Sequence, residues 1–254
     1  MKQFLHFISI LLCHLIVVTA IAQNIDESER LFSKGQIQFK KGNKHKAEEI
    51  FQKVLILNPH HYKAHDYIRM IYDQGYTSIP LMACYRMALI SYKTTTGKDL
   101  YKMIDYYAHR FITRTDSGNI VHVAPYFVRQ MDTVFENNIS VMEAGFIAAG
   151  SLDFPANYDT LNDAEKLIRK LKFIFERHDQ RRSNNYGFYW DYYIDYFADL
   201  SKTSHLKTAC YMIFYRKDDI EIKNWIDNNP LKVKEFDEWD KQELRVVTNK
   251  NYKY

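Results

Sequence analysis

One segment of the chain, residues 186–200, combines many aromatic side chains with a row of carboxylates. Asp191, Asp195 and Asp199 recur at every fourth position, so a helix would carry them on one face. Trp190 and its tyrosine and phenylalanine neighbours would surround that row. Aromatic rings stack on sugars or peptides while carboxylates accept hydrogen bonds. This helix is therefore a candidate site for binding a glycan or similar polymer, or for an enzyme acting on one.

The same segment also fits a purely structural role. A helix that is apolar on nearly all sides is usually buried, and its few polar residues then form a seam toward solvent. Carboxylates at this spacing repel one another by roughly 0.2–0.5 kcal/mol per pair unless cations meet them. The cations close to them in sequence are Arg181, Arg182, Lys202 and Lys207. Both interpretations stay open at the level of sequence.

Few other residues have the spacing that metal or nucleophile chemistry needs. His61 and His65 lie four positions apart at the start of a predicted helix, where two imidazoles can face one metal. No third ligand is evident nearby in sequence, which favours surface positions for both. Cys84 and Cys210 lie in apolar helical contexts, where they form a disulfide in an oxidising compartment or remain two buried thiols. No short motif of a hydrolase, kinase or zinc enzyme occurs, so we assign no catalytic residue, metal or cofactor and favour a non-catalytic protein.

The elements that position these residues are predicted to be helices. Only 8 Gly and 5 Pro occur among 254 residues, whereas barrels, sandwiches and dinucleotide-binding folds need such residues at their turns. Hydrophobic residues make up 46% of the chain and aromatic residues 15%, enough for a large core. The fold class is therefore predicted to be all-α. A formal net charge of +4 is small for this length and implies no nucleic-acid partner.

The first 22 residues have the features of a signal peptide. Lys2 precedes a short apolar stretch, and Ala20 and Ala22 form a small-x-small cleavage signal before Gln23. The apolar run is short for a membrane anchor. Export is therefore predicted, with no stable membrane insertion after cleavage.

Residues 28–61 follow a helix-turn-helix pattern with a small residue where the two helices would meet. Around Phe51, apolar residues recur at the spacing of one helix face, and Gly35 on the first helix allows close approach. The positions that carry the pattern are Leu31, Gly35, Gly42, Ala47, Phe51 and Pro59. The segment resembles a tetratricopeptide repeat, whose period is about 34 residues. Residues 62–95 continue the register, but Arg69 and Lys93 stand where a small residue and Pro are expected.

Helical periodicity continues beyond the second unit. One stripe runs from Leu100 to Phe111 and another from Leu161 to Phe175, each typical of a helix that buries one face. A loop is predicted over residues 113–119. Further helices are predicted over residues 123–137, 140–149, 186–200, 205–216, 218–228 and 231–244. Helices joined by short connections favour an α-solenoid or a compact helical array.

The chain is accordingly predicted to have a signal peptide and two helical regions. The predicted parts are a signal peptide over 1–22, tetratricopeptide-like repeats over 23–95, a C-terminal all-α region over 96–247 and a frayed tail over 248–254. The boundary after residue 95 falls in the turn-like run Thr94 to Gly97.

The resemblance also implies a groove lined by the first helix of each unit. Its residues would be Phe32, Gln36 and Phe39 from the first unit and Asp66, Met70 and Asp73 from the second. A groove that mixes aromatic, methionine and acidic side chains suits an amphipathic peptide or helix. The expected protein is an exported, non-catalytic interaction scaffold at the periplasm or surface of a Gram-negative bacterium, with a peptide or protein partner.

Overall fold

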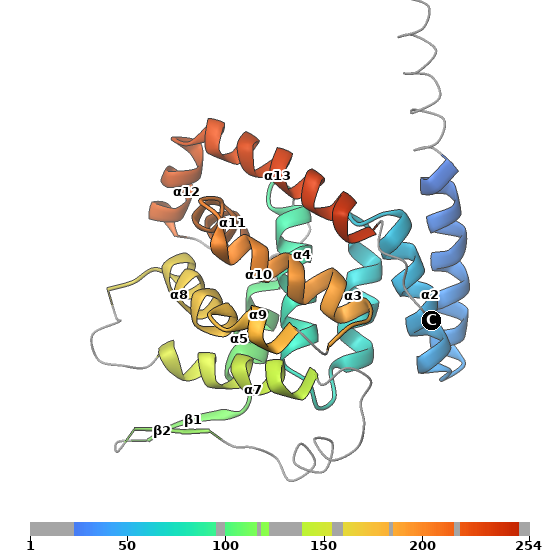
Figure 1. Cartoon of the computed structure of the whole chain (residues 1–254), viewed down its shortest axis with the longest axis horizontal. Helices are drawn as coiled ribbons and strands as arrows, with labels where there is room; N and C mark the ends of the chain where they lie inside the picture. Colours follow the sequence, from blue (N-terminus) through green and yellow to red (C-terminus); the bar gives the residue numbers. More distant parts are fainter. Residues whose placement is uncertain are drawn as a thin grey trace, which may run out of the picture. The chain divides into compact units, whose positions relative to one another are not determined.

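The residues that the computed structural model describes are helical almost throughout, so the class is all-α, as predicted (Figure 1). They are residues 23–94, 100–115, 118–121, 139–153, 160–182, 185–215 and 219–248. The predicted signal peptide, the helix predicted over 123–137 and the tail beyond Thr248 lie outside them. The chain forms two compact units, Met1–Ala64 and His65–Tyr254.

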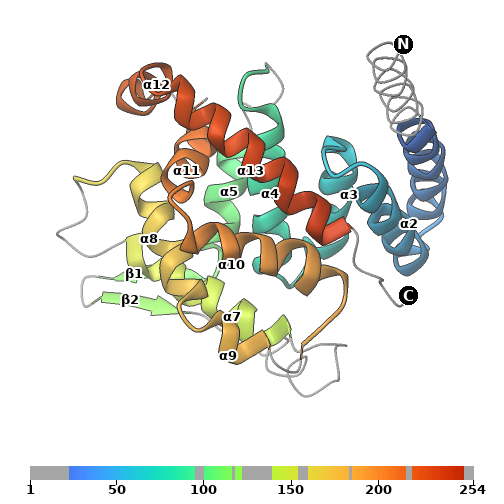
Figure 2. The same ribbon diagram turned by 45° about the horizontal axis from the view of Figure 1, so that its top comes forward.

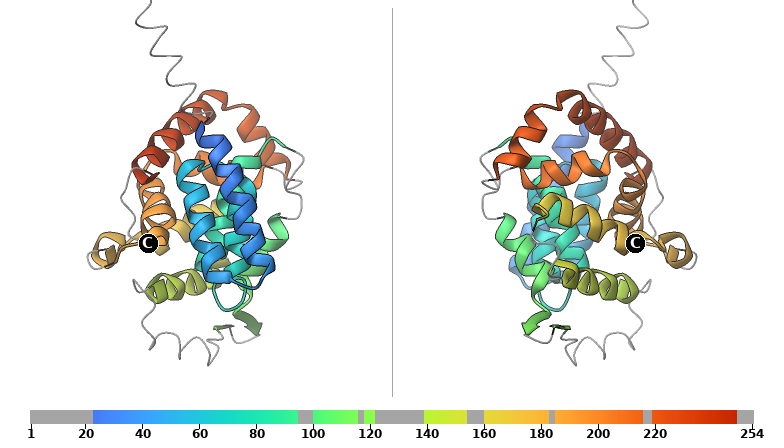
Figure 3. Two further views of the ribbon diagram at one scale, coloured as in Figure 1. Left: turned by 90° about the vertical axis from the view of Figure 1, so that its right-hand side faces the viewer. Right: turned by 90° about the vertical axis from the view of Figure 1, so that its left-hand side faces the viewer.

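In the described part of the N-terminal unit two helices lie side by side, over residues 23–40 and Lys44–Leu57 (α2) (Figure 3). Gly42 turns the chain between them with a φ of 80°, a conformation that strains residues with a side chain. A Cβ on Gly35 would lie 2.6 Å from a ring carbon of Phe51, so the absence of a side chain allows the predicted close approach. The stripe predicted for α2 is largely confirmed by the residues it buries: Ala47, Phe51, Gln52, Val54 and Leu55.

Three helices follow: α3 (Tyr62–Tyr72), α4 (Ser78–Ser91) and α5 (Leu100–His109). α4 begins and ends 34 residues after α2. It is buried on nearly every side, because Arg86 is its only charged residue. α5 buries one face through Leu100, Ile104, Tyr107 and Ala108, which confirms the stripe predicted there.

A short hairpin interrupts the helices. β1 (Ile112–Thr115) and β2 (Gly118–Val121) pair antiparallel, with Ile112 opposite Val121 and Thr115 opposite Gly118. The prediction of a loop over 113–119 is therefore wrong for the residues in β1 and β2, where β-branched residues such as Thr113 and Ile120 pair across the hairpin.

The next helices confirm two predictions. α7 (Ile139–Gly150) coincides with the helix predicted over 140–149, and a 3-10 turn (Ser151–Asp153) follows it. α8 (Asp163–Phe175) starts at a capping box, in which Asn162 accepts a hydrogen bond from the Glu165 N–H at 3.0 Å and Glu165 accepts one from the Asn162 N–H. It buries the predicted stripe: Ala164, Leu167, Leu171, Ile174 and Phe175. The short helix α9 (His178–Arg182) comes next.

The last described elements of the chain are also helices. They are a π-helix (Trp190–Ile194) that continues into α10 (Asp195–Lys202), then α11 (Leu206–Phe214), α12 (Ile220–Asp227) and α13 (Pro230–Thr248). α11 packs against α4, α8, α12 and α13, and α13 also packs against α10 (Figure 2). Pro230 is the first residue of α13, a position that does not need a backbone N–H.

α4 packs directly against α5, and residues 95–99 between them lie outside the described part of the chain. The boundary expected after residue 95 stays a prediction. Within the described ranges, no helix combines the length and apolar character that a bilayer span requires.

Candidate functional site

The N-terminal unit holds three of the residues predicted to line the groove. Phe32 is buried, with its ring centroid 5.7 Å from that of Phe51 and 4.5 Å from that of His61. Gln36 and Phe39 are half-buried. Phe32 therefore belongs to the core of this unit, because its ring fills the space between Phe51 and His61.

The other three groove residues lie on α3 and just after it, in the C-terminal unit. Asp66 pairs with Arg69, with 2.8 Å between Oδ1 and Nε. The Tyr107 hydroxyl donates a hydrogen bond to the Asp73 carboxylate. Met70 is half-buried. Both acids thus have partners within their own unit, and the groove as a whole stays a prediction.

The aromatic side chains of residues 188–197 lie in the core. Trp190, Tyr193, Tyr196 and Phe197 are each 0% exposed, and Phe188, Tyr189 and Tyr192 are buried too. Stacking on a ligand needs an accessible ring face, and these rings stack on one another instead, as Phe188 does on Tyr192 at 4.8 Å. The structural interpretation of this segment therefore describes it better than the ligand-site interpretation.

Positively charged side chains form ion pairs with the carboxylate row beside those rings. Arg182 pairs with Asp191 and with Asp195, where Nε and Oδ1 are 2.9 Å apart. Asp195 also lies 3.0 Å from Nε2 of His178, whose ring stacks on Trp190. Lys202 lies 3.9 Å from Asp199. The structure thus confirms the expected pairing with Arg182 and Lys202, which offsets the repulsion within the row.

The paired histidines are buried, which corrects the prediction of surface positions. Nδ1 of His61 accepts a hydrogen bond from the Ala64 N–H at 3.1 Å, at the start of α3. Nδ1 of His65 lies 2.7 Å from the Tyr193 hydroxyl. Each imidazole is therefore part of the packed interior. Within the described ranges, no group of three metal-ligating side chains occurs.

Both cysteines are free thiols in the core. Burial raises the pKa of Cys84 and of Cys210 well above the ordinary value, so neither forms a thiolate readily. They act as small apolar core residues, one of the two alternatives that the sequence left open.

Two buried polar clusters had no signal in the sequence. Arg86 of α4 donates a hydrogen bond to Asp240 of α13 at 2.6 Å, and the Tyr196 hydroxyl donates a second to the same oxygen. Glu143 of α7 accepts hydrogen bonds from the Thr77 and Ser78 N–H groups at the start of α4, while burial raises its pKa. These clusters tie helices together, and their members lie too far apart in sequence for any short pattern to reveal them.

The C-terminal unit contains an open pocket of about 250 Å³, which we call the α5–α8 pocket. α5 and α8 both pack against α7, and side chains from α4 and α11 complete the walls of the space between them. The lining residues are Tyr85, Tyr101, Lys102, Ile104, Asp105, Ala108, His109, Asp163, Lys166, Leu167, Lys170 and Phe214.

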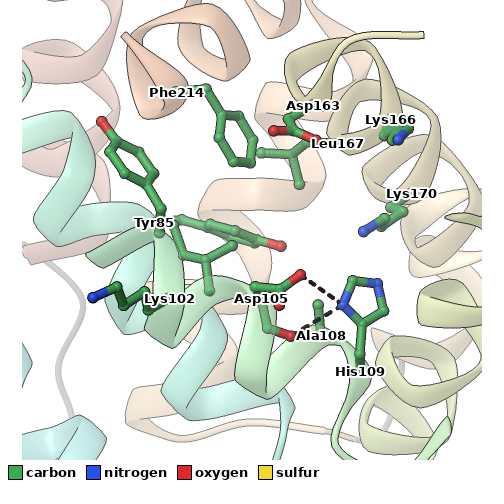
Figure 4. A pocket seen from close by; sticks show the side chains of 12 residues that line it. Tyr85, Lys102, Asp105, Ala108, His109, Asp163, Lys166, Leu167, Lys170 and Phe214 are labelled. Carbon is green, nitrogen blue, oxygen red and sulfur yellow. Dashed lines mark hydrogen bonds and ion pairs between the residues drawn. The ribbon is translucent and has the colours of Figure 1, made fainter. Parts of the chain in front are cut away.

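The α5–α8 pocket has an apolar part and a charged part. Tyr85, Leu167 and Phe214 are buried and form apolar wall (Figure 4). Lys170 lies on the side of His109, whose Nδ1 is 3.0 Å from Asp105, and Lys166 lies next to Leu167 on α8 (Figure 4). None of these residues was singled out from the sequence as a site. The available signal was the i, i+3, i+4, i+7 spacing of Asp163, Lys166, Leu167 and Lys170 on α8.

Comparisons with family models, with curated proteins and with solved structures found no match for this chain. Its function therefore has to be inferred from its own residues.

Proposed function

We propose that the protein is an exported, non-catalytic scaffold that binds a peptide or protein partner on tetratricopeptide-like helix pairs. The observation that carries this proposal is the spacing of α2 and α4, whose first and last residues are each 34 apart. That spacing equals the period of the repeat family which residues 28–61 resemble. The contact of Gly35 with Phe51 adds support, because the family places a small residue where its two helices meet.

The proposed partner is an amphipathic peptide or helix. Gln36 and Phe39 are half-buried, so each keeps some exposed surface, and Met70 on α3 is half-buried too. Phe and Met side chains adapt to varied apolar surfaces, which suits recognition of a helix face. Phe32 contributes by supporting the helix pair, since it is buried.

Affinity capture from an envelope extract with the full chain tests this proposal. Phe39→Ser and Met70→Ser should each weaken binding of the captured partner by about tenfold or more, as loss of an apolar anchor does. Ile37→Ser is the matched control, because Ile37 is 51% exposed on the same helix and lies outside the proposed groove. Equal binding by all variants with native circular dichroism spectra would contradict the groove.

Export is the second part of the proposal and has its own test. The signal-like sequence over residues 1–22 supports cleavage before Gln23 and a location in the periplasm or at the cell surface of a Gram-negative bacterium. Cell fractionation followed by mass spectrometry of the N-terminus should recover a chain that begins at Gln23. A full-length chain in the cytoplasmic fraction would contradict export and leave the groove test unaffected.

A further inference from the structure

We infer that the α5–α8 pocket binds a small aromatic carboxylate. This inference goes beyond the scaffold proposal, because the pocket shares no residue with the proposed groove. Binding pockets for small molecules typically combine apolar walls with a few polar groups that fix orientation. The α5–α8 pocket has this composition.

The apolar part of the pocket suits a planar body. Tyr101 and Phe214 stack with their ring centroids 6.0 Å apart and an interplanar angle of 22°. Tyr85 and Leu167 add buried apolar surface from α4 and α8. An aromatic ring can lie against such walls, because offset stacking and edge contacts between rings are favourable. The volume of about 250 Å³ restricts the occupant to a small molecule.

The charged part of the pocket suits an anion. Lys166 and Lys170 lie four residues apart on α8, so their two ammonium groups occupy one face of the helix. Two ammonium groups on one helix face can contact the same anion. His109 lies on the same side of the pocket (Figure 4).

The two acids that line the pocket, Asp105 and Asp163, do not remove its preference for an anion. The exposed Asp105 carboxylate is 3.0 Å from Nδ1 of His109, so these two groups meet each other. Asp163 lines the pocket at the first turn of α8. Lys166 and Lys170 remain together on the His109 side of the pocket, while Lys102 extends away from it (Figure 4), so the negative charge of a ligand is expected beside Lys166 and Lys170.

Calorimetric titration of the full chain with cinnamate, and with cinnamyl alcohol as its neutral counterpart, tests the inference. Cinnamate should bind about tenfold more tightly than the alcohol, because only the carboxylate adds a charge–charge attraction to its hydrogen bonds with the lysine ammonium groups. Lys170→Gln and Lys166→Gln should each remove most of that difference. Lys172→Gln is the control, since Lys172 is exposed on α8 outside the pocket lining. Rising salt should weaken cinnamate binding more than alcohol binding.

A second variant separates the pocket from other surfaces. Ala108→Leu adds apolar volume to the pocket without changing its charge, and it should abolish binding of both compounds while the circular dichroism spectrum stays native. The inference fails if neither compound binds saturably to the wild-type chain. It also fails if acid and alcohol bind equally, if Lys172→Gln matches Lys170→Gln, or if Ala108→Leu leaves binding unchanged.

Discussion

The two units of the protein differ in where their polar and aromatic side chains find partners. In the described part of the N-terminal unit the contacts span at most a few tens of residues, as between Phe32 and His61. In the C-terminal unit they span long stretches, as between Arg86 and Asp240, 154 residues apart. A core built from local contacts can be predicted from spacing, whereas one built from distant contacts cannot.

The largest expected effect tests a distant contact. Asp240→Ala should lower the free energy of unfolding by about 3–5 kcal/mol, because it leaves the buried Arg86 guanidinium without its charged partner. Urea unfolding followed by circular dichroism measures the change. Glu238→Ala on the same helix should change it by less than about 0.5 kcal/mol, since its carboxylate is exposed and 3.9 Å from Lys234.

A paired replacement sharpens that test. Arg86→Met combined with Asp240→Leu removes both charges, so it should recover most of the stability lost in Asp240→Ala. If the double variant is as unstable as the single one, loss of packing rather than an unpaired charge explains the effect.

The second prediction compares one substitution in both units. Gly35→Ala should destabilise the N-terminal unit by about 1–3 kcal/mol, because the new Cβ would lie 2.6 Å from the Phe51 ring. Gly145→Ala on α7 should instead stabilise by about 0.5–1 kcal/mol, since its nearest neighbour would be Arg181 Nη1 at 3.7 Å. Hydrogen exchange of the amides in each unit measures both changes separately. Equal effects would mean that Gly35 is not a close-contact position.

A smaller effect is expected at the carboxylate row. Asp195→Ala should destabilise by about 1–2 kcal/mol, because His178 and Arg182 lose their shared acceptor in a mostly buried position. Asp199→Ala should be close to neutral, since its side chain is 49% exposed and lies 3.9 Å from Lys202. Thermal unfolding of both variants is the measurement. Equal losses in the two variants would contradict the prediction that Asp195 contributes more to stability than Asp199.

The smallest expected effect is a pH dependence in the N-terminal unit. Burial lowers the pKa of His61 below its ordinary value of 6.5, and a proton on Nδ1 would displace the hydrogen bond from Ala64. The folded state therefore favours the neutral imidazole. The contribution of this preference to the free energy of unfolding is complete above pH 6.5, and it is lost as the pH falls toward the lowered pKa of the folded state.

The measurement is hydrogen exchange at the start of α3 as a function of pH. His61→Gln should remove the loss of protection on acidification, because the amide side chain does not titrate in this range. His45→Gln is the control, since His45 is 86% exposed and should leave the pH profile unchanged. A wild-type profile that is flat below pH 6.5 would contradict the role of His61.

Much of the fold followed from patterns within single helices. The stripes of α2, α5 and α8 gave their buried faces, because apolar residues at helical spacing mark the side that leaves water. The hairpin was missed because four-residue strands carry a weak pattern. The alternative ligand site illustrates the limit: the rings around Trp190 have the composition of a binding platform, and burial assigns them to the core.

The sequence by itself determined the all-α class, the helix pair around Gly35 and Phe51, and the buried faces of α2, α5 and α8. Only the tertiary structure decided that Phe32 is buried, that Asp195 meets His178 and Arg182, and that α4, α5, α8 and α11 enclose a pocket. The physical reason is the separation in sequence between the residues that interact. Periodicity fixes which face of a helix is apolar, while the face it meets depends on how elements far apart in the chain pack together.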